Sequence, residues 1–78
     1  MKVRVRLEFP ERLVREPVLA RVVERFGVLP NIRRAEVAET TGWIVCELDG
    51  ESATIDEAIR WLVAEGVDVE PLGDVVEG

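Results

Sequence analysis

The sequence predicts a single small α+β domain in which two helices cover one face of an antiparallel sheet. Its 78 residues are fewer than the roughly 100 to 200 of an ordinary domain, so a second domain is excluded. Hydrophobic residues make up 47% of the chain and charged residues 33%, which is enough apolar material for a core. Apolar residues recur with a period of two in four segments and with helical spacing in two others.

The first predicted strand and helix are the clearest elements. Residues 2–9 alternate charged and apolar side chains, which is typical of a strand with one solvated face. Pro10 ends this strand, and Pro17 stands where a helix accepts proline, at its first turn. Gly27 then supplies the left-handed residue that ends the helix. The apolar stripe of this helix consists of Val18, Leu19, Val22, Val23 and Phe26.

Two further strands, residues 31–39 and 43–49, flank a predicted hairpin at residues 40–42. Side chains along the second of these strands alternate between two faces of the sheet. Ile44, Cys46 and Leu48 share the face toward the core, and Trp43, Val45 and Glu47 share the open face.

The second helix and the last strand complete the chain. Thr54 and Glu57 have the spacing of a capping box, which predicts a helix start, and Gly66 ends the helical pattern. Residues 67–70 alternate again as a short last strand, and we expect residues 72–78 to form a loose C-terminal tail.

The element order is therefore βαββαβ over one domain, residues 1–78. Right-handed crossovers place both helices on the same sheet face, which gives a ferredoxin-like two-layer sandwich with strand order 4-1-3-2. The strand that begins at Asn31 and the final strand are the predicted edges. The predicted core is Val5, Leu7, Val22, Phe26, Ile44, Leu48, Ile59 and Leu62.

Composition excludes several classes of function. The net charge of −6 repels nucleic-acid phosphates, so we expect no nucleic-acid partner. The chain has no histidine and one cysteine, Cys46, so we expect no metal site, cofactor or imidazole-based catalysis. A weaker alternative, an enzyme that uses carboxylates, stays open. No apolar run reaches the length of a leader or a membrane span, so we expect a cytoplasmic protein without membrane insertion.

Ferredoxin-like folds carry unrelated activities, so individual residues must indicate the function. The open face carries charged residues where RNA-binding members have aromatic ones, and the loop after the first strand lacks the glycines of acylphosphatases. We expect its glutamates and arginines to form cross-strand ion pairs. Trp43 lies on this face, where it serves either a partner or simple lateral packing.

One long segment resembles a known family, the NIL domain. The segment runs Phe26-Gly27-Val28-Leu29-Pro30-Asn31-Ile32-Arg33-Arg34-Ala35-Glu36-Val37 and continues with Gly42-Trp43-Ile44-Val45-Cys46-Glu47-Leu48-Asp49-Gly50. The family is named for an Asn-Ile-Leu triplet after the first helix, and the chain is similar to it from Val3 to Glu70. Arg33 stands where the family has an apolar residue.

The resemblance implies a regulatory function. NIL domains occur at the C-terminus of methionine-importer ATPase subunits, where a pair of them binds methionine and inhibits transport, and beside iron–sulfur modules. By this resemblance Asn31 is the polar residue of a ligand site, Ile32 and Arg33 flank it, and Val37 lines its apolar part. A purely local role for Asn31, in satisfying the turn after Pro30, stays open.

We therefore expect a homodimeric, non-enzymatic module that senses a small amino acid such as methionine. Its partner would be a transporter ATPase or an iron–sulfur protein. The alternative is a ligand-free dimerisation or protein-interaction module. Met1 favours a stand-alone protein over a module cut from a longer chain.

Overall fold

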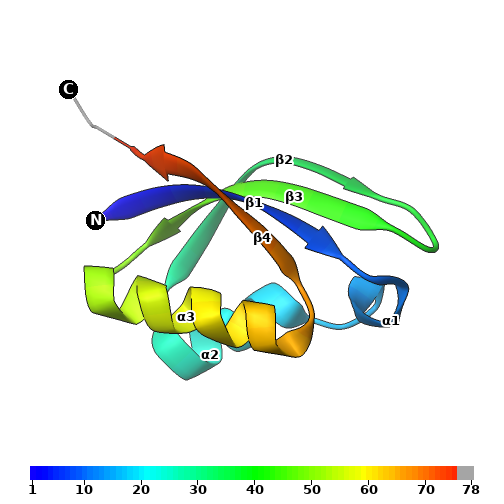
Figure 1. Ribbon diagram of the computed structural model, residues 1–78, viewed down its shortest axis with the longest axis horizontal. Coiled ribbons are helices and arrows are strands. Elements are labelled where there is room, and N and C mark those ends of the chain that lie inside the picture. Colours follow the sequence, from blue (N-terminus) through cyan, green and yellow to red (C-terminus); the bar gives the residue numbers. More distant parts are fainter. Residues whose placement is uncertain (76–78) are drawn as a thin grey trace.

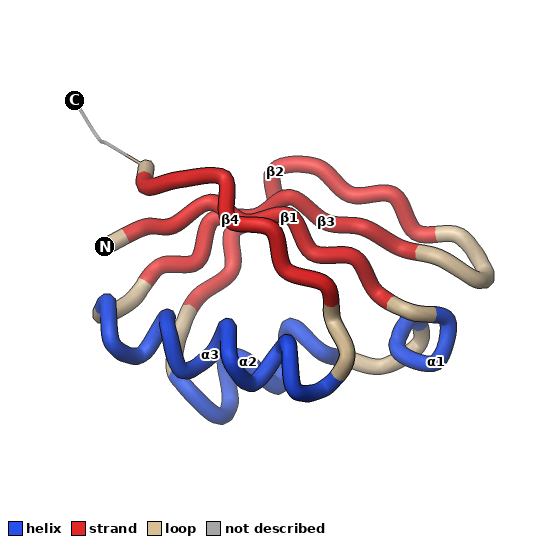
Figure 2. Tube along the Cα trace, viewed as in Figure 1, coloured by secondary structure: helices blue, strands red, loops and turns tan. Residues whose placement is uncertain are grey.

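The computed structural model describes residues 1–75 and confirms the predicted α+β sandwich. Four strands form one antiparallel sheet in the order β2-β3-β1-β4, which is the predicted order 4-1-3-2. Helices α2 and α3 lie together beneath one face of this sheet, and the other face is open (Figures 1 and 2). The elements are β1 (Lys2–Phe9), α1 (Glu11–Val14), α2 (Val18–Phe26), β2 (Leu29–Val37), β3 (Gly42–Asp49), α3 (Ser52–Glu65) and β4 (Asp68–Asp74).

Local chemistry explains where the main elements begin and end. Val5 and Leu7 of β1 are fully buried, as the alternation of charged and apolar residues predicts. Helix α2 ends at Gly27 and α3 ends at Gly66, with φ angles of +67° and +105°. Glycine adopts this left-handed conformation without the steric penalty of a Cβ atom.

The core lies between the sheet and the two long helices. It contains Val5, Leu7, Leu13, Val18, Val22, Val28, Cys46, Leu48, Ile55, Ala58, Leu62 and Val67. Three residues of the predicted core, Phe26, Ile44 and Ile59, are instead half-buried at its margin.

Several predicted elements differ from the structure, among them the strand predicted over residues 31–39, which is β2 over Leu29–Val37. A four-residue helix, α1, follows Pro10 and places Leu13 in the core. Helix α3 begins at Ser52 without a side-chain cap, so Thr54 and Glu57 do not form a capping box. Strand β4 continues through Pro71 to Asp74, because an edge strand tolerates proline. Residues 72–74 of the predicted loose tail are therefore strand, and residues 76–78 lie outside the described residues.

Strand β2 forms one edge of the sheet and is the least covered element. Its residues 31–37 are all exposed. Its ladder to β3 shifts register between Ile32 and Arg34, so Arg33 is the extra residue of a β-bulge. None of the helices within residues 1–75 is long and apolar enough to cross a membrane.

Candidate functional site

All four residues of the predicted ligand site lie on the exposed edge strand β2. Residues directly opposite each other in a ladder share one face of the sheet. Asn31 is opposite Glu47, whose side chain belongs to the open face, and Ile32 is opposite the buried Cys46. Val37 is opposite Gly42, near the hairpin end of the strand. Asn31 therefore faces outward from the helices, and Ile32 faces the helix layer.

The β-bulge changes which of these residues share a face. On a regular strand, Asn31 and Val37 would share a face because they are six residues apart. The extra residue at Arg33 reverses this relation, so Val37 lies on the helix side with Ile32. Within one chain, Asn31 and Val37 therefore lie on opposite faces of the sheet.

The Asn31 end of the strand borders a polar hollow on the surface. It has a volume of about 230 Å³ and is lined by Lys2, Leu29, Pro30, Asn31, Glu47 and Asp49. At its base, the Glu47 residue is only 8% exposed although it lies on the open face. The Arg4 guanidinium donates a hydrogen bond to the Glu47 carboxylate across 2.8 Å, as the expected cross-strand ion pairing requires.

Glu47 is surrounded by positive charge. The hydrogen bond from Arg4 lowers the pKa of the Glu47 carboxyl group below its ordinary value, against the opposing effect of desolvation. The charges of Arg4, Arg33 and Lys2 lower this pKa further. The ionised form of the Glu47 carboxyl group is thus favoured, chiefly by the hydrogen bond from Arg4. The sequence predicts the cross-strand pairing of Arg4 with the open-face glutamates, and the structure adds that Arg33 also acts on Glu47.

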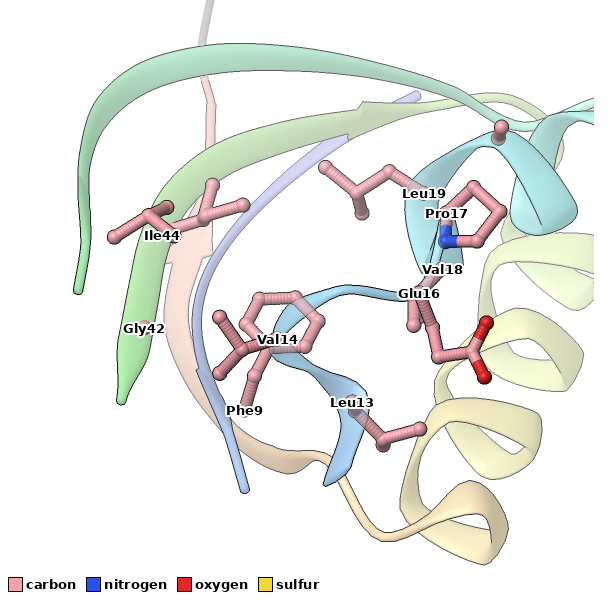
Figure 3. Close-up of a pocket in the computed structure, with 11 residues that line it drawn as sticks. Phe9, Leu13, Val14, Glu16, Pro17, Val18, Leu19, Gly42 and Ile44 are labelled. Atoms are coloured by element: carbon pink, nitrogen blue, oxygen red, sulfur yellow. The ribbon is translucent and has the colours of Figure 1, made fainter. Parts of the chain in front are cut away.

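Val37 borders a separate, apolar cavity between the sheet and the segment that leads into α2. This cavity has a volume of about 210 Å³. Val14 and Leu19 extend toward Ile44 across it, whereas the Glu16 carboxylate points away toward α3 (Figure 3). Glu16 accepts a hydrogen bond from Arg21 on that side, at 3.1 Å. Helix α1 and the turn after it form much of the wall, which is why the sequence did not predict the cavity.

The two tryptophans take part in side-chain packing. The Arg6 guanidinium lies 5.3 Å from the ring centre of Trp43 on the open face. Trp61 packs edge-to-face on Phe26, with ring centres 6.0 Å apart. The Arg25 guanidinium lies over the Trp61 ring. Lateral packing, one of the two predicted roles of Trp43, is therefore present.

The remaining reactive groups have structural explanations. Burial raises the pKa of the Cys46 thiol to about 11, and the neighbouring Glu47 charge adds to this effect. Cys46 is thus the small core residue that its place on β3 predicts. Within residues 1–75, no group of three or more potential ligands is arranged to hold a metal ion.

The fold and the exposed Asn31 strand together define a member of one family. The NIL domain family model matches residues 3–71, so the chain belongs to the NIL domain family. Among curated proteins, the chain is 37% identical over 75 residues to the methionine import ATP-binding protein MetN of Ralstonia nicotianae. It is 33% identical over 70 residues to methionine import ATP-binding protein MetN 3 of Bacillus cereus.

These relatives are much longer than the chain. The Ralstonia match covers 91% of this chain and 21% of the relative, and the Bacillus match covers 85% and 20%. A solved structure, the C-terminal domain of an ABC transporter ATP-binding protein from Enterococcus faecalis, superposes with a TM-score of 0.79 at 25% identity. That superposition covers 94% of this chain and 86% of the solved one.

Proposed function

We propose that this NIL domain is a regulatory binding module that senses a small amino acid such as methionine and modulates a partner protein. The partner proposed is an ABC transporter ATPase, because the relatives named for methionine import carry this domain. The domain itself performs no catalysis in this proposal, and it acts in the cytoplasm, where such ATPases bind ATP. An iron–sulfur protein is the second candidate partner, from the family resemblance alone.

One observation carries the proposal: the strand with the family triplet is an uncovered edge of the sheet. Its outward backbone groups and the Asn31 amide can serve both ends of an amino acid. The amide oxygen accepts from an ammonium group, and the amide NH₂ donates to a carboxylate. Uncovered edges also pair readily with further strands, so the same observation supports a dimer.

The edge is self-complementary in an antiparallel pair of copies. If the two β2 strands pair about Ala35, Arg34 of each copy lies opposite Glu36 of the other. Past the bulge at Arg33, Ile32 of one copy then comes opposite Val37 of the second. Ile32 and Val37 are 52% and 64% exposed, and their pairing would remove both from water.

This pairing brings Ile32 of one copy opposite Val37 of the second, on the helix side of the joined sheet. Asn31 lies at the same end of the new ladder, on the open face. A ligand at this end of the ladder contacts both copies. In this proposal the ligand site is complete only in the dimer.

Titration calorimetry with methionine and a panel of other amino acids tests the proposal. We expect heat of binding for the parent chain and none for Asn31→Ala, with the same melting temperature for both, because Asn31 is exposed and outside the core. Thr41→Ala, in the exposed hairpin, is the matched control and should bind like the parent. An absence of heat from every amino acid at millimolar concentration would contradict ligand sensing.

The alternative is a ligand-free dimerisation or protein-interaction module. The exposed apolar residues Leu29, Ile32 and Val37 favour it, because they cluster on one edge strand. This module would dimerise or bind its partner equally well with and without amino acids. The calorimetric panel and a measurement of dimer affinity therefore separate the two functions.

A further inference from the structure

Several apolar side chains stay partly exposed at the hairpin end of the sandwich. Phe9, Leu19 and Ile44 are half-buried at the margin of the core, and Val37 is 64% exposed. All four line the apolar cavity of about 210 Å³ between the sheet and the start of α2 (Figure 3). Protein interiors are close-packed, and apolar surface left in water costs free energy. An added apolar side chain in this cavity would therefore be stabilising.

Val37 and Gly42 form the wall of the cavity at the edge of the sheet. They lie opposite each other in the ladder between β3 and the edge strand β2. Outside its chain neighbours, a Cβ atom at Gly42 would meet nothing closer than 3.8 Å, and the methyl groups of Val37 would be 3.9 Å away. Glycine at this position thus leaves space beside Val37, on the helix side of the sheet.

The charges of β2 favour a second copy of this chain as the source of the added side chain. Arg34 and Glu36 flank Ala35, so the strand is self-complementary in the antiparallel pairing proposed above. The other edge strand, β4, contains three carboxylates and no basic residue, so two copies of it would bring like charges together. Pro71 also removes a backbone donor from β4. Of the two edges, β2 is the one suited to pair with itself.

Ile32 is the side chain that this pairing brings to the cavity. It lies opposite Val37 of the second copy, on the helix side of the joined sheet. Opposite residues of an antiparallel ladder have Cβ atoms about 4.5–5.5 Å apart, so Ile32 reaches the Val37 wall. Ile32 is 52% exposed within one copy, so it has apolar surface left for such a contact.

We propose that Ile32 of each copy packs into the Val37 side of the apolar cavity of the other copy and closes it. The start of α2 then belongs to the interface, because Leu19 lines the same cavity. The middle residue of the family triplet is thereby an interface residue, whereas Asn31, on the open face, stays the proposed ligand residue. The inference rests on the proposed dimer and adds the side chain and the cavity through which the two copies contact each other.

A double-mutant cycle on the full chain, measured by sedimentation velocity, tests this contact. Ile32→Ala should raise the dimer Kd at least tenfold, because the two-fold axis removes the side chain from two cavities. Val63→Ala on α3 is the matched control, since Val63 is 56% exposed, and it should change Kd less than twofold. Gly42→Val fills the space beside Val37 from within and should weaken the dimer at least fivefold. In the Gly42→Val background, Ile32→Ala should change Kd less than threefold, because the cavity no longer admits Ile32.

The contrary outcomes separate this contact from the dimer itself. A dimeric parent in which Ile32→Ala behaves like Val63→Ala overturns the inference and leaves the dimer intact. Equal effects of Ile32→Ala with and without Gly42→Val also overturn it, because Ile32 then acts outside the cavity. A parent that is monomeric at every concentration contradicts the proposed dimer and the inference together.

Two features of the design keep the result interpretable. Thermal unfolding shows whether each variant is folded, and Gly42→Ala replaces Gly42→Val if the larger side chain prevents folding. The added Cβ of Gly42→Ala meets only ordinary van der Waals contacts, and the same reduction of the Ile32→Ala effect should appear, to a smaller extent. The measurements contain no amino acid, so a failure of ligand sensing alone leaves them unchanged.

Discussion

Charge reversal along β2 tests the proposed pairing of two copies. In the antiparallel arrangement about Ala35, Arg34 of each copy faces Glu36 of the other. Arg34→Glu alone, or Glu36→Arg alone, places like charges opposite each other at two symmetric positions. The double variant with both substitutions restores opposite charges at both positions.

The structure sets the size of the effect. Both side chains are exposed, so each cross-strand pair contributes about 0.2–1 kcal/mol. The two-fold axis doubles this contribution, and a reversal adds repulsion of similar size. A single reversal should therefore weaken the dimer by about 1–4 kcal/mol, which is roughly 5-fold to several hundred-fold in Kd. The double variant should recover most of the parent affinity.

Sedimentation velocity over a range of protein concentrations measures these affinities. The parent should sediment at twice its 8.8 kDa chain mass at micromolar concentration. Arg60→Glu makes the same charge change on exposed α3 and should leave the dimer unchanged. A monomeric parent at every concentration, or a double variant as weak as the single ones, would refute the arrangement.

Three further predictions concern stability, each measured by urea unfolding. Phe26→Ala should destabilise by about 2 kcal/mol, roughly half the 3–5 kcal/mol for a fully buried Phe, because Phe26 is only half-buried; a loss below about 0.5 kcal/mol would show that its packing is misassigned. Gly66→Ala should cost about 1 kcal/mol more than Gly27→Ala, since only at Gly66 would the new Cβ displace the Arg12 guanidinium from the Glu65 carbonyl; equal costs would contradict this. Folding lowers the pKa of Glu47, so this residue stabilises the folded state at pH values above its ordinary pKa of 4.5, and the stabilisation is lost as the pH falls through the folded pKa. In Glu47→Gln the free energy of unfolding should therefore fall less steeply as the pH is lowered. An unchanged dependence of this free energy on pH would refute the assignment.

The sequence predicted the fold well because periodicity is a local property. The alternation in β1 and the stripe in α2 need no distant partner to be recognised, and glycine after each long helix indicates its end. The failures lie where tertiary contacts override local signals. Strand β4 passes through Pro71 because only one side of it is paired, and α3 begins ahead of Thr54 because packing of Ile55 and Ala58 decides its position.

The candidate site was predicted only in part, for a geometric reason. Its four residues do lie together on one exposed strand, as the family triplet indicates. Residues alternate between the two faces along a strand, so an inserted residue changes the face of every residue beyond it. The bulge at Arg33 inserts one such residue. A bulge is a property of the ladder to β3 and is invisible in β2 alone. The pairing of Arg4 with Glu47 could be predicted, because alternation along β1 and β3 places both side chains on the open face.

Ligand binding and dimerisation should therefore be linked. The bulge limits the regular β2 pairing to the Arg34–Glu36 region and leaves Asn31 of one copy at the end of the ladder where Ile32 meets Val37 of the other. A ligand held there contacts both copies, so it must raise the dimer affinity by the same factor by which dimerisation raises ligand affinity. Saturating amino acid should tighten the parent dimer at least fivefold in sedimentation experiments. The Asn31→Ala dimer should not respond, and an equal response in both proteins would place the ligand away from this edge.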